Sequence, residues 1–384
     1  MAVKKLAFIK KIGKSILLLA TFIAAIMLLF SVLAKILPPS VSSVIAYCGL
    51  LFPYIFFVNI VTLVIWLIID YRWALLPTIV ILLNVNNFDR HFQLRAQDRP
   101  ETCANCIKVM SYNAHAFNIY ADNYLASNKK LLKFLSNEKP DILCIQEYCN
   151  DKRGKRKLNM TQEILKVLGL PDNERSHKLF LPIESKFGYE YGLAIFSCYR
   201  IVDSGIVETE DSSSNKAFYV DIRYNGDTLR VYNIHLASYH MGNEDYETSK
   251  AILHNEAGNN PEINEKARKL HHKISDTFIQ RQHQAKCVRA HIDTCEVPII
   301  ICGDFNDSPA SFSYYKIGHG FKDTFRSSGK GTGNTYRGDA LPAFRIDYIL
   351  HDRQYNDFGH TVCTDLDVSD HYPIYSYISI INKK

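Results

Sequence analysis

Residues 15–88 are almost free of charge, and this feature constrains the fold of the chain more than any other. Between Ser15 and Phe88 only Lys35, Asp70 and Arg72 carry charge, whereas the later sequence has the mixed charge of an ordinary water-exposed domain. The apolar run from Ser15 to Leu37 is long enough to cross the ~30 Å hydrocarbon core of a bilayer as a helix. It exceeds the apolar region of a signal peptide and lacks a small-residue cleavage site.

Two further apolar runs follow. Residues 38–40, Pro-Pro-Ser, predict a turn, and the second run extends from Val44 to Ile69. A third run, from Trp73 to about Leu83, is interrupted by Pro77 and ended early by asparagines. This third run fits a buried core helix as well as it fits a membrane span. We therefore expect residues 1–88 to form a membrane anchor with two or three transmembrane helices.

The distribution of positive charge predicts the orientation of this anchor. Five lysines lie within the first 14 residues, so the positive-inside rule puts the N-terminus in the cytoplasm and the uncharged loop 38–43 outside. With three spans the rest of the chain is extracytoplasmic, and with two it is cytoplasmic. Arg72 fits a cytoplasmic link between the second and third runs and favours three. We expect a multi-pass protein of the cell membrane, with the lipid bilayer as a partner.

The remaining sequence predicts a linker and one large domain. Segment 89–104 is polar and contains Pro100, which indicates a linker before a domain over residues 105–384. The formal net charge of +6 permits an anionic partner without requiring one, and no basic stripe interleaved with aromatic residues is obvious. The ten cysteines form no framework, and the Cys103–Cys106 pair lacks the second pair or spaced histidine of a zinc site. No protein partner is implied.

Short apolar runs that end in polar residues recur through this domain. They cover residues 107–113, 141–147, 191–197, 218–223, 229–235, 297–304 and 344–350, with predicted helices over 127–135 and 263–293. These runs are too short for helices and too apolar for one-sided surface strands, so they predict two sheets packed face to face with helices outside. The polar residues at their ends are Asn113, Glu147, His235, Asp304, Asp347 and the Asp370–His371 pair. Strands of a sandwich would bring these residues together at one rim.

Six short pieces, in order along the chain, resemble the endonuclease/exonuclease/phosphatase superfamily, whose members include DNase I-like nucleases and sphingomyelinases. The pieces are Ser111–Asn113, Ile145–Glu147, Tyr232–Leu236, Gly303–Asp307, Arg345–Ile349 and Ser369–Pro373. The resemblance implies a four-layer α/β sandwich, two packed mixed β-sheets flanked by helices, with the active site at one rim. Residues 1–100 are similar to the membrane segment of bacterial members.

The chemistry of phosphate-ester hydrolysis predicts a metal ion. The reaction requires neutralised phosphoryl oxygens, an activated water and a stabilised leaving oxygen. Mg²⁺ prefers few protein oxygens and retains bound waters. Glu147 is therefore the expected principal ligand, with Asn113 and Asp370 adding to its shell. Mg²⁺ is the expected ion, and Mn²⁺ is the alternative.

The resemblance also implies catalytic roles. Asp304 would orient or deprotonate the attacking water, and Asn306 would donate a hydrogen bond to the phosphoryl group. His371, held by Asp347, would be a cationic donor, because a neighbouring carboxylate raises the pKa of an imidazole. His235 would be a second donor on the opposite side.

The sequence thus predicts a membrane-anchored, Mg²⁺-dependent phosphoesterase that hydrolyses a phosphodiester in nucleic acid or in a phospholipid headgroup. Abasic-site endonucleases of the superfamily commonly have Tyr where His235 stands, which disfavours a role in DNA repair. The alternatives are a phosphomonoesterase acting on inositol or sugar phosphates, and a non-catalytic membrane-linked binding module. His115 is expected to lie outside the catalytic set, and segment 240–262 is expected to be an insertion near the site.

Overall fold

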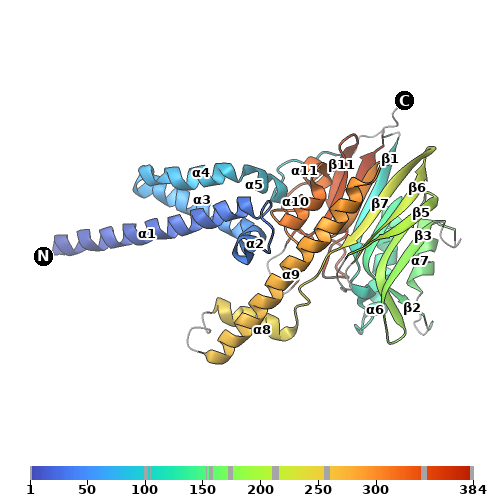
Figure 1. Ribbon diagram of the computed structural model, residues 1–384, viewed down its shortest axis with the longest axis horizontal. Helices are drawn as coiled ribbons and strands as arrows, with labels where there is room; N and C mark the ends of the chain where they lie inside the picture. The colour runs from blue at the N-terminus through green and yellow to red at the C-terminus, as the bar shows by residue number, and fades with distance from the viewer. Residues whose placement is uncertain are drawn as a thin grey trace.

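The computed structural model describes residues 2–98, 103, 105–152, 154, 159–171, 176–209, 216–254, 260–338 and 344–380. A helical N-terminal unit projects from a large β-sandwich, and a long helical arm projects from the same side (Figure 1).

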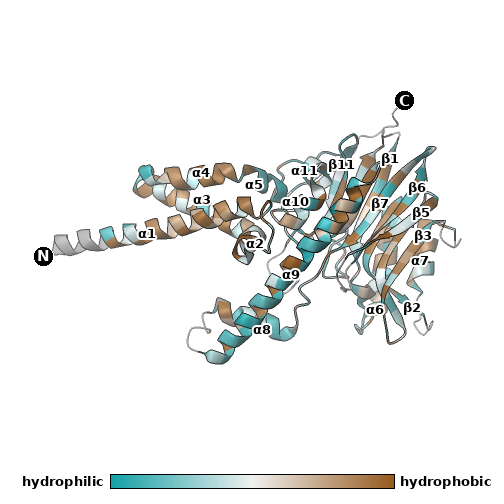
Figure 2. Ribbon diagram, viewed as in Figure 1, coloured by the Kyte–Doolittle hydropathy of each residue, from teal (hydrophilic) through white to brown (hydrophobic). Residues whose placement is uncertain are grey.

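The N-terminal unit is helical throughout. Its elements are α1 (Ala2–Leu33), α2 (Ser43–Leu50), α3 (Phe52–Ile69), the 3-10 helix η1 (Tyr71–Ala74), α4 (Leu75–Leu83) and α5 (Val85–His91). Two stretches, Lys11–Leu33 and Phe52–Ile69, are long and apolar enough to cross a membrane, and Tyr71–Leu83 is a shorter apolar stretch. Almost all exposed large hydrophobic side chains of the described residues belong to this unit, which is accordingly brown in Figure 2.

Polar side chains inside this apolar unit are hydrogen-bonded. The third apolar run stops at Asn84, as expected, but the chain becomes helical again at once as α5. The amide of Asn84 donates to the backbone oxygen of Leu28 at 3.0 Å, and that of Asn87 donates to Ser31 at 3.1 Å. These asparagines therefore connect the third run to α1 rather than merely ending a helix.

Several contacts fix the N-terminal unit against the sandwich. Ser308 Oγ donates to the backbone oxygen of Gly49 at 3.0 Å, and Arg345 donates to the backbone oxygen of Arg90 at 2.8 Å. Within the segment predicted as a linker, residues 89–91 belong to α5, and the next residues hydrogen-bond to the sandwich through their backbone. The two units are joined by packing as well as by the chain.

The sandwich consists of two six-stranded mixed sheets. The first has the order β11-β12-β1-β2-β4-β3 and the second β5-β6-β7-β8-β10-β9. The strands of the first sheet are β1 (Cys106–Asn113), β2 (Ile142–Asp151), β3 (Lys178–Lys186), β4 (Tyr189–Ser197), β11 (Asn356–Val362) and β12 (Ile374–Ser379). Those of the second are β5 (Ile201–Val207), β6 (Ala217–Tyr224), β7 (Asp227–His235), β8 (Ile299–Asp304), β9 (Phe321–Asp323) and β10 (Asp347–Asp352). The β1–β2 and β7–β8 pairs are parallel, and the other pairs are antiparallel.

Helices cover both outer faces, so the predicted four-layer α/β sandwich is confirmed. The elements are η2 (His115–Asn118), α6 (Tyr124–Glu138), α7 (Met160–Leu168), α8 (Asn243–Leu253), α9 (Pro261–Asp293), α10 (Phe312–Gly318) and α11 (Thr324–Ser328). Helices α6 and α7 pack on the first sheet, and α9 and α10 pack on the second. A third apolar cluster fills the space between the sheets, with Ile107, Val231 and Ile300 fully buried. Apolar packing between the two sheets and on both outer faces therefore holds the strands that carry the site in place.

Two local features fix the strands that carry the candidate site. The turn at Asn225–Gly226 joins β6 to β7, with φ of 47° and 90°, the left-handed values that a two-residue hairpin turn requires. On β8, a Cβ at Gly303 would lie 2.1 Å from the backbone oxygen of Ile234, so only glycine permits the close approach of β7 and β8 there.

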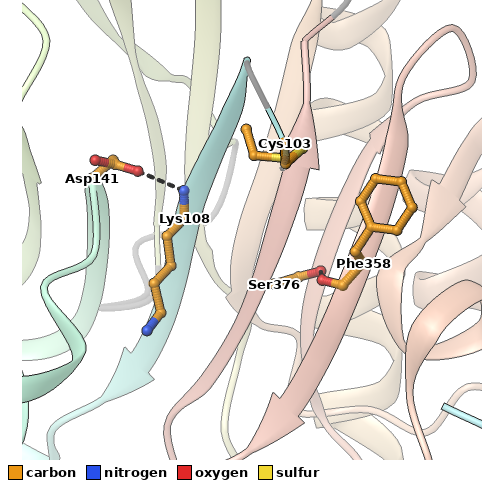
Figure 3. Close-up of a disulfide and its surroundings, with 6 residues drawn as sticks. Cys103, Lys108, Asp141, Phe358 and Ser376 are labelled. Atoms are coloured by element: carbon orange, nitrogen blue, oxygen red, sulfur yellow. Dashed lines mark hydrogen bonds between the residues drawn. A yellow bond between two sulfur atoms is a disulfide. The ribbon is translucent and has the colours of Figure 1, made fainter. Parts of the chain in front are cut away.

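A disulfide joins Cys103 to Cys106 at the start of β1 (Figure 3). Next to it, the backbone N–H of Lys108 donates to Asp141 at 2.7 Å, which ties β1 to the residue before β2. The other eight cysteines are free thiols.

Candidate active site

Strand register brings three of the predicted residues into one row on the second sheet. The parallel β7–β8 pair sets His235 opposite Asp304, and the antiparallel β8–β10 pair sets Asp347 opposite Asp304. All three side chains are at least 92% buried. Because neighbouring strands are ~4.8 Å apart, this register alone holds the imidazole and two carboxylates side by side.

Two more predicted residues come from the first sheet. Asn113 ends β1, and Glu147 lies on β2 where the pairing with β4 slips between Ile145 and Tyr148. Glu147 has a left-handed φ of 48°, and such an irregularity re-aims a side chain out of the regular alternation. The amide of Asn113 donates to Glu147 at 3.1 Å and to Asp304 at 3.0 Å. Asn113 thus connects the two sheets at the rim.

His371 and Asp347 form a buried ion pair. His371 Nδ1 lies 2.9 Å from Asp347 Oδ2, and its Nε2 lies 3.7 Å from Asp304 Oδ2. Burial by itself would lower the pKa of His371, but the charges of Asp347 and Asp304 outweigh it and raise this pKa to about 10. His371 is therefore a fixed cation near neutral pH.

For Asp304, burial raises the pKa instead of lowering it. Burial, followed by the charge of Asp347, raises the pKa of Asp304 to about 7. The backbone N–H of Asn306 donates to Asp304 Oδ1 at 2.7 Å and orients it. A carboxylate with a pKa close to neutrality can accept a proton during a reaction and release it afterwards.

Asn306 and His235 complete the predicted catalytic set. The side chain of Asn306 donates to the backbone oxygen of Leu236 at 3.0 Å, and its backbone oxygen accepts from the buried Arg281 of α9. His235 Nε2 lies 3.7 Å from both Glu147 and Asp304. Burial lowers the pKa of His235, so this imidazole is neutral where His371 is charged.

The Glu147–Asp370 pair fits a divalent cation. Both carboxylates approach one point, since His115 Nδ1 lies 3.2 Å from Asp370 and 3.8 Å from Glu147. The side chains of Glu147 and Asp370 are each 35% exposed, which leaves room for the waters that Mg²⁺ retains. Although burial would raise it, the pKa of Asp370 falls to about 2 because His115 and His371 stabilise the charged form. Asn113 borders this pair through its hydrogen bond to Glu147.

A second group could also hold a metal ion. Three buried residues each offer one ligand atom, and these atoms lie within 4.8 Å of one another: Asp304, Asp347 and His371. A protonated His371 already supplies a positive charge to both carboxylates there. The Glu147–Asp370 pair is therefore the better candidate for the cation.

His115, which the sequence did not place among the catalytic residues, lies beside Glu147 and Asp370. It begins a turn in which His115, Ala116, Phe117 and Asn118 all have φ between 44° and 56°. Non-glycine residues in this left-handed region cost about 1–2 kcal/mol each, and such strain concentrates at functional sites. No sequence pattern signals this turn, since none of its residues is glycine.

A cavity of about 450 Å³ opens beside the site. Its polar end is formed by His115, Glu147, Asn306, Asp370 and His371. The rest of its lining comes from α2, the α8–α9 region and the segments around Tyr336 and Phe344. Segment 240–262, predicted as an insertion near the site, contains α8 and contributes His240, Met241, Tyr246 and Ser249 to this lining. No pattern in the sequence indicates that α2 reaches the cavity.

Comparison with known proteins assigns a family to this arrangement. A four-layer sandwich with carboxylates, amides and histidines at one rim defines the chain as a hydrolase of the DNase I-like class. The model of the endonuclease/exonuclease/phosphatase family matches residues 110–371, and the chain belongs to this family. Members of its superfamily are metal-dependent hydrolases of phosphate esters, as the sequence predicted. The model of a domain of unknown function matches residues 14–91.

The chain is similar to several solved structures. An endonuclease/exonuclease/phosphatase family protein from Leptotrichia buccalis is 17% identical, with a TM-score of 0.50 over 71% of this chain and 100% of that one. A family protein from Beutenbergia cavernae is 16% identical, with a TM-score of 0.49 over 72% of each chain. The human Nocturnin catalytic domain is 17% identical, with a TM-score of 0.49 over 72% of this chain and 95% of that one. No curated protein matches the chain.

Proposed function

We propose that the protein is a membrane-anchored, Mg²⁺-dependent phosphodiesterase that acts by metal-assisted attack of water. The observation that carries this proposal is the buried row of His371, Asp347 and Asp304, in which one fixed cation and one carboxylate of near-neutral pKa lie side by side. Phosphoester hydrolysis needs a donor to the phosphoryl oxygens next to a base for water.

The metal-binding role falls to Glu147 and Asp370, with Asn113 shaping the shell. A bound Mg²⁺ would neutralise charge on the phosphoryl oxygens. The two partly exposed carboxylates supply the few oxygen ligands that this ion accepts from protein, and the Asn113 side chain holds Glu147 in place by donating to it. Mn²⁺ would suit the same oxygen ligands.

The remaining residues act on water and phosphate. Asp304 accepts a proton from the attacking water, whose oxygen forms the new bond to phosphorus as the bond to the leaving oxygen breaks. His371 donates to a phosphoryl oxygen from Nε2, since its Nδ1 is held by Asp347. Asn306 and the neutral His235, which also lie next to Asp304, donate further hydrogen bonds to the phosphoryl group. The leaving oxygen takes a proton from water or from this set.

Two hollows share Glu147 in their lining, and this arrangement favours a diester over a monoester. One is the cavity of about 450 Å³, and the second, of about 210 Å³, is also lined by Ile183, Glu184, Tyr191 and His235. A phosphodiester has two substituents and needs room for both, whereas a monoester of inositol or a sugar needs one. A non-catalytic binding module would have no need for the paired acid and base.

We further propose that residues 1–88 anchor the protein and that the catalytic domain, residues 105–384, lies outside the cytoplasm. In Figure 1 the chain passes along the N-terminal unit three times, as α1, as α3, and as α4 followed by α5, which supports three spans. Lys14 pairs with Asp70, which follows α3, and Figure 1 shows the turn between α3 and α4 at the end of this unit that lies away from the sandwich. By the positive-inside rule that end is cytoplasmic. The Cys103–Cys106 disulfide fits an oxidising compartment.

The test is an assay of the full-length protein in detergent micelles with Mg²⁺ and bis(4-nitrophenyl) phosphate. We expect release of 4-nitrophenol that EDTA abolishes and added Mg²⁺ or Mn²⁺ restores. His371→Ala should lower this rate on the order of 10²-fold. Absence of hydrolysis by folded protein across the two ions would refute the proposal.

A further inference from the structure

The larger cavity has a polar end and an apolar end, and the N-terminal unit builds part of the apolar end. The site residues Glu147, Asp370 and His371 line one end. The apolar part is formed by Tyr47, Leu50, Leu51, Met241, Ile274 and Phe344. All six are only partly buried, and Leu51 is 37% exposed. The cavity can therefore accommodate a ligand that is phosphate at one end and hydrocarbon at the other.

The α2 wall of this cavity is held firmly in place. Tyr47 stacks on His271 of α9 at 5.6 Å between ring centroids and packs edge-on against Phe278 at 5.2 Å. A Cβ at Gly49 would lie 2.9 Å from the backbone oxygen of Ala310, so the backbones of these two residues are in direct contact. Because α2 is fixed to both α9 and the loop after β8, the apolar wall is a built feature of the site.

The position of α2 in the chain connects this wall to the bilayer. Helix α2 lies in the loop between the two stretches that could cross a membrane, Lys11–Leu33 and Phe52–Ile69. A helix in such a loop lies at the level of the lipid headgroups, on the side of the membrane where the sandwich lies (Figure 1). The hydrocarbon part of a lipid can reach Leu50 and Leu51 from there without crossing water.

The charge of the lining disfavours nucleic acid. Among the described residues that line this cavity there is no lysine or arginine. Proteins that bind single-stranded nucleic acid combine stacking aromatic residues with a positively charged groove, and phosphate contacts from Lys and Arg supply much of the affinity. The aromatic residues here, such as Tyr47 and Phe344, stand beside aliphatic side chains instead.

We propose that the substrate is a phosphate ester with a long hydrocarbon chain, taken from the bilayer, whose chain occupies the cavity between α2 and α9. This inference rests on the proposed phosphodiesterase activity and names its substrate class. Each buried CH₂ group contributes about 0.8 kcal/mol to binding. A few buried groups therefore give a preference on the order of 10-fold or more over a short-chain ester.

The experiment compares 4-nitrophenyl hexadecyl phosphate with 4-nitrophenyl methyl phosphate, which share the reacting bond and the leaving group. The full-length protein is assayed in mixed micelles with Mg²⁺, and kcat/KM is measured for each ester. We expect the wild type to favour the hexadecyl ester about 10-fold or more. Ile274→Ser and the more exposed Leu51→Ser should each lower that preference several-fold. Ile252→Ser, which removes an exposed hydrophobic side chain of α8 outside the cavity, should leave it unchanged.

Vesicles of phosphatidylcholine and of phosphatidic acid, and a single-stranded oligonucleotide, identify the source of the phosphate ester. Hydrolysis of phosphatidylcholine ahead of the oligonucleotide supports the proposal, whereas hydrolysis of phosphatidic acid alone would make the enzyme a lipid phosphomonoesterase and would overturn the proposed phosphodiesterase. Equal kcat/KM for the two synthetic esters, a preference unaltered in both cavity variants, or faster cleavage of the oligonucleotide would overturn the lipid assignment but leave the phosphodiesterase intact. Failure to hydrolyse any of these substrates would refute both the lipid assignment and the proposed phosphodiesterase activity.

Discussion

The His371–Asp347 pair permits the most mechanism-specific prediction. If Asp347 acts by holding His371 in place and protonated, then Asp347→Asn and His371→Ala disable the same donor. In the proposed mechanism His371 Nε2 donates one hydrogen bond to the phosphoryl group, since Nδ1 is bound to Asp347 at 2.9 Å. Loss of one preorganised donor costs about 2.7–4 kcal/mol, or 10²- to 10³-fold in rate. Because residues that act as a unit are non-additive, the double variant should be little slower than the slower single variant.

The pH–rate profile gives the pair a second, independent readout. The charge of Asp347 raises the pKa of both His371 and Asp304. In Asp347→Asn both pKa values fall, so the acid limb, set by deprotonation of Asp304, and the alkaline limb, set by deprotonation of His371, both move to lower pH. The assay is kcat/KM for bis(4-nitrophenyl) phosphate across pH 5–11. Multiplicative losses with an unmoved profile would refute the pairing and make Asp347 a direct substrate or metal contact.

Three further predictions concern topology, the disulfide and acid stability. A C-terminal alkaline phosphatase fusion should be active and a β-galactosidase fusion inactive, and the reverse pattern would require two spans. Thiol labelling of the denatured protein should gain two sites on reduction and none in the Cys103→Ser/Cys106→Ser variant; equal labelling would exclude the disulfide. Burial lowers the pKa of the His360 imidazole from its ordinary value of 6.5 to about 4, so the unfolded chain binds the proton more readily. The free energy of unfolding should therefore fall by about 3 kcal/mol as the pH drops from about 6.5 to 4. His360→Asn should flatten this dependence in thermal unfolding, and an unchanged slope would contradict it.

The central strands and the rim could be predicted because burial on both faces leaves a clear mark in sequence. The runs ending in Asn113, His235 and Asp304 correspond to β1, β7 and β8, and their polar ends meet as expected. The edge strands β3 and β5 escaped prediction, since their alternation of exposed and buried residues is irregular. The alternation in β12, where Ile374, Ser376 and Ile378 are fully buried, is also typical of a strand.

The rest of the site could not be predicted, because it depends on contacts between distant segments. His115 enters through a left-handed turn made of residues that rarely adopt that conformation. Leu50 and Leu51 belong to the predicted anchor, and only the docking of α2 on α9 brings them to the cavity. A linear pattern describes neighbours within a strand or helix, and neither feature is of that kind.

The most direct test of the account is the metal dependence of Glu147→Gln. This variant removes the charge of the principal ligand and keeps the size of the side chain. We expect wild-type turnover to vanish in EDTA and return with Mg²⁺, and the variant to stay inactive at moderate Mg²⁺ with an unchanged melting temperature. Glu265→Gln, at an exposed position on α9, should behave as wild type. Full turnover in EDTA, or near-normal turnover of Glu147→Gln at moderate Mg²⁺, would contradict the metal-dependent mechanism.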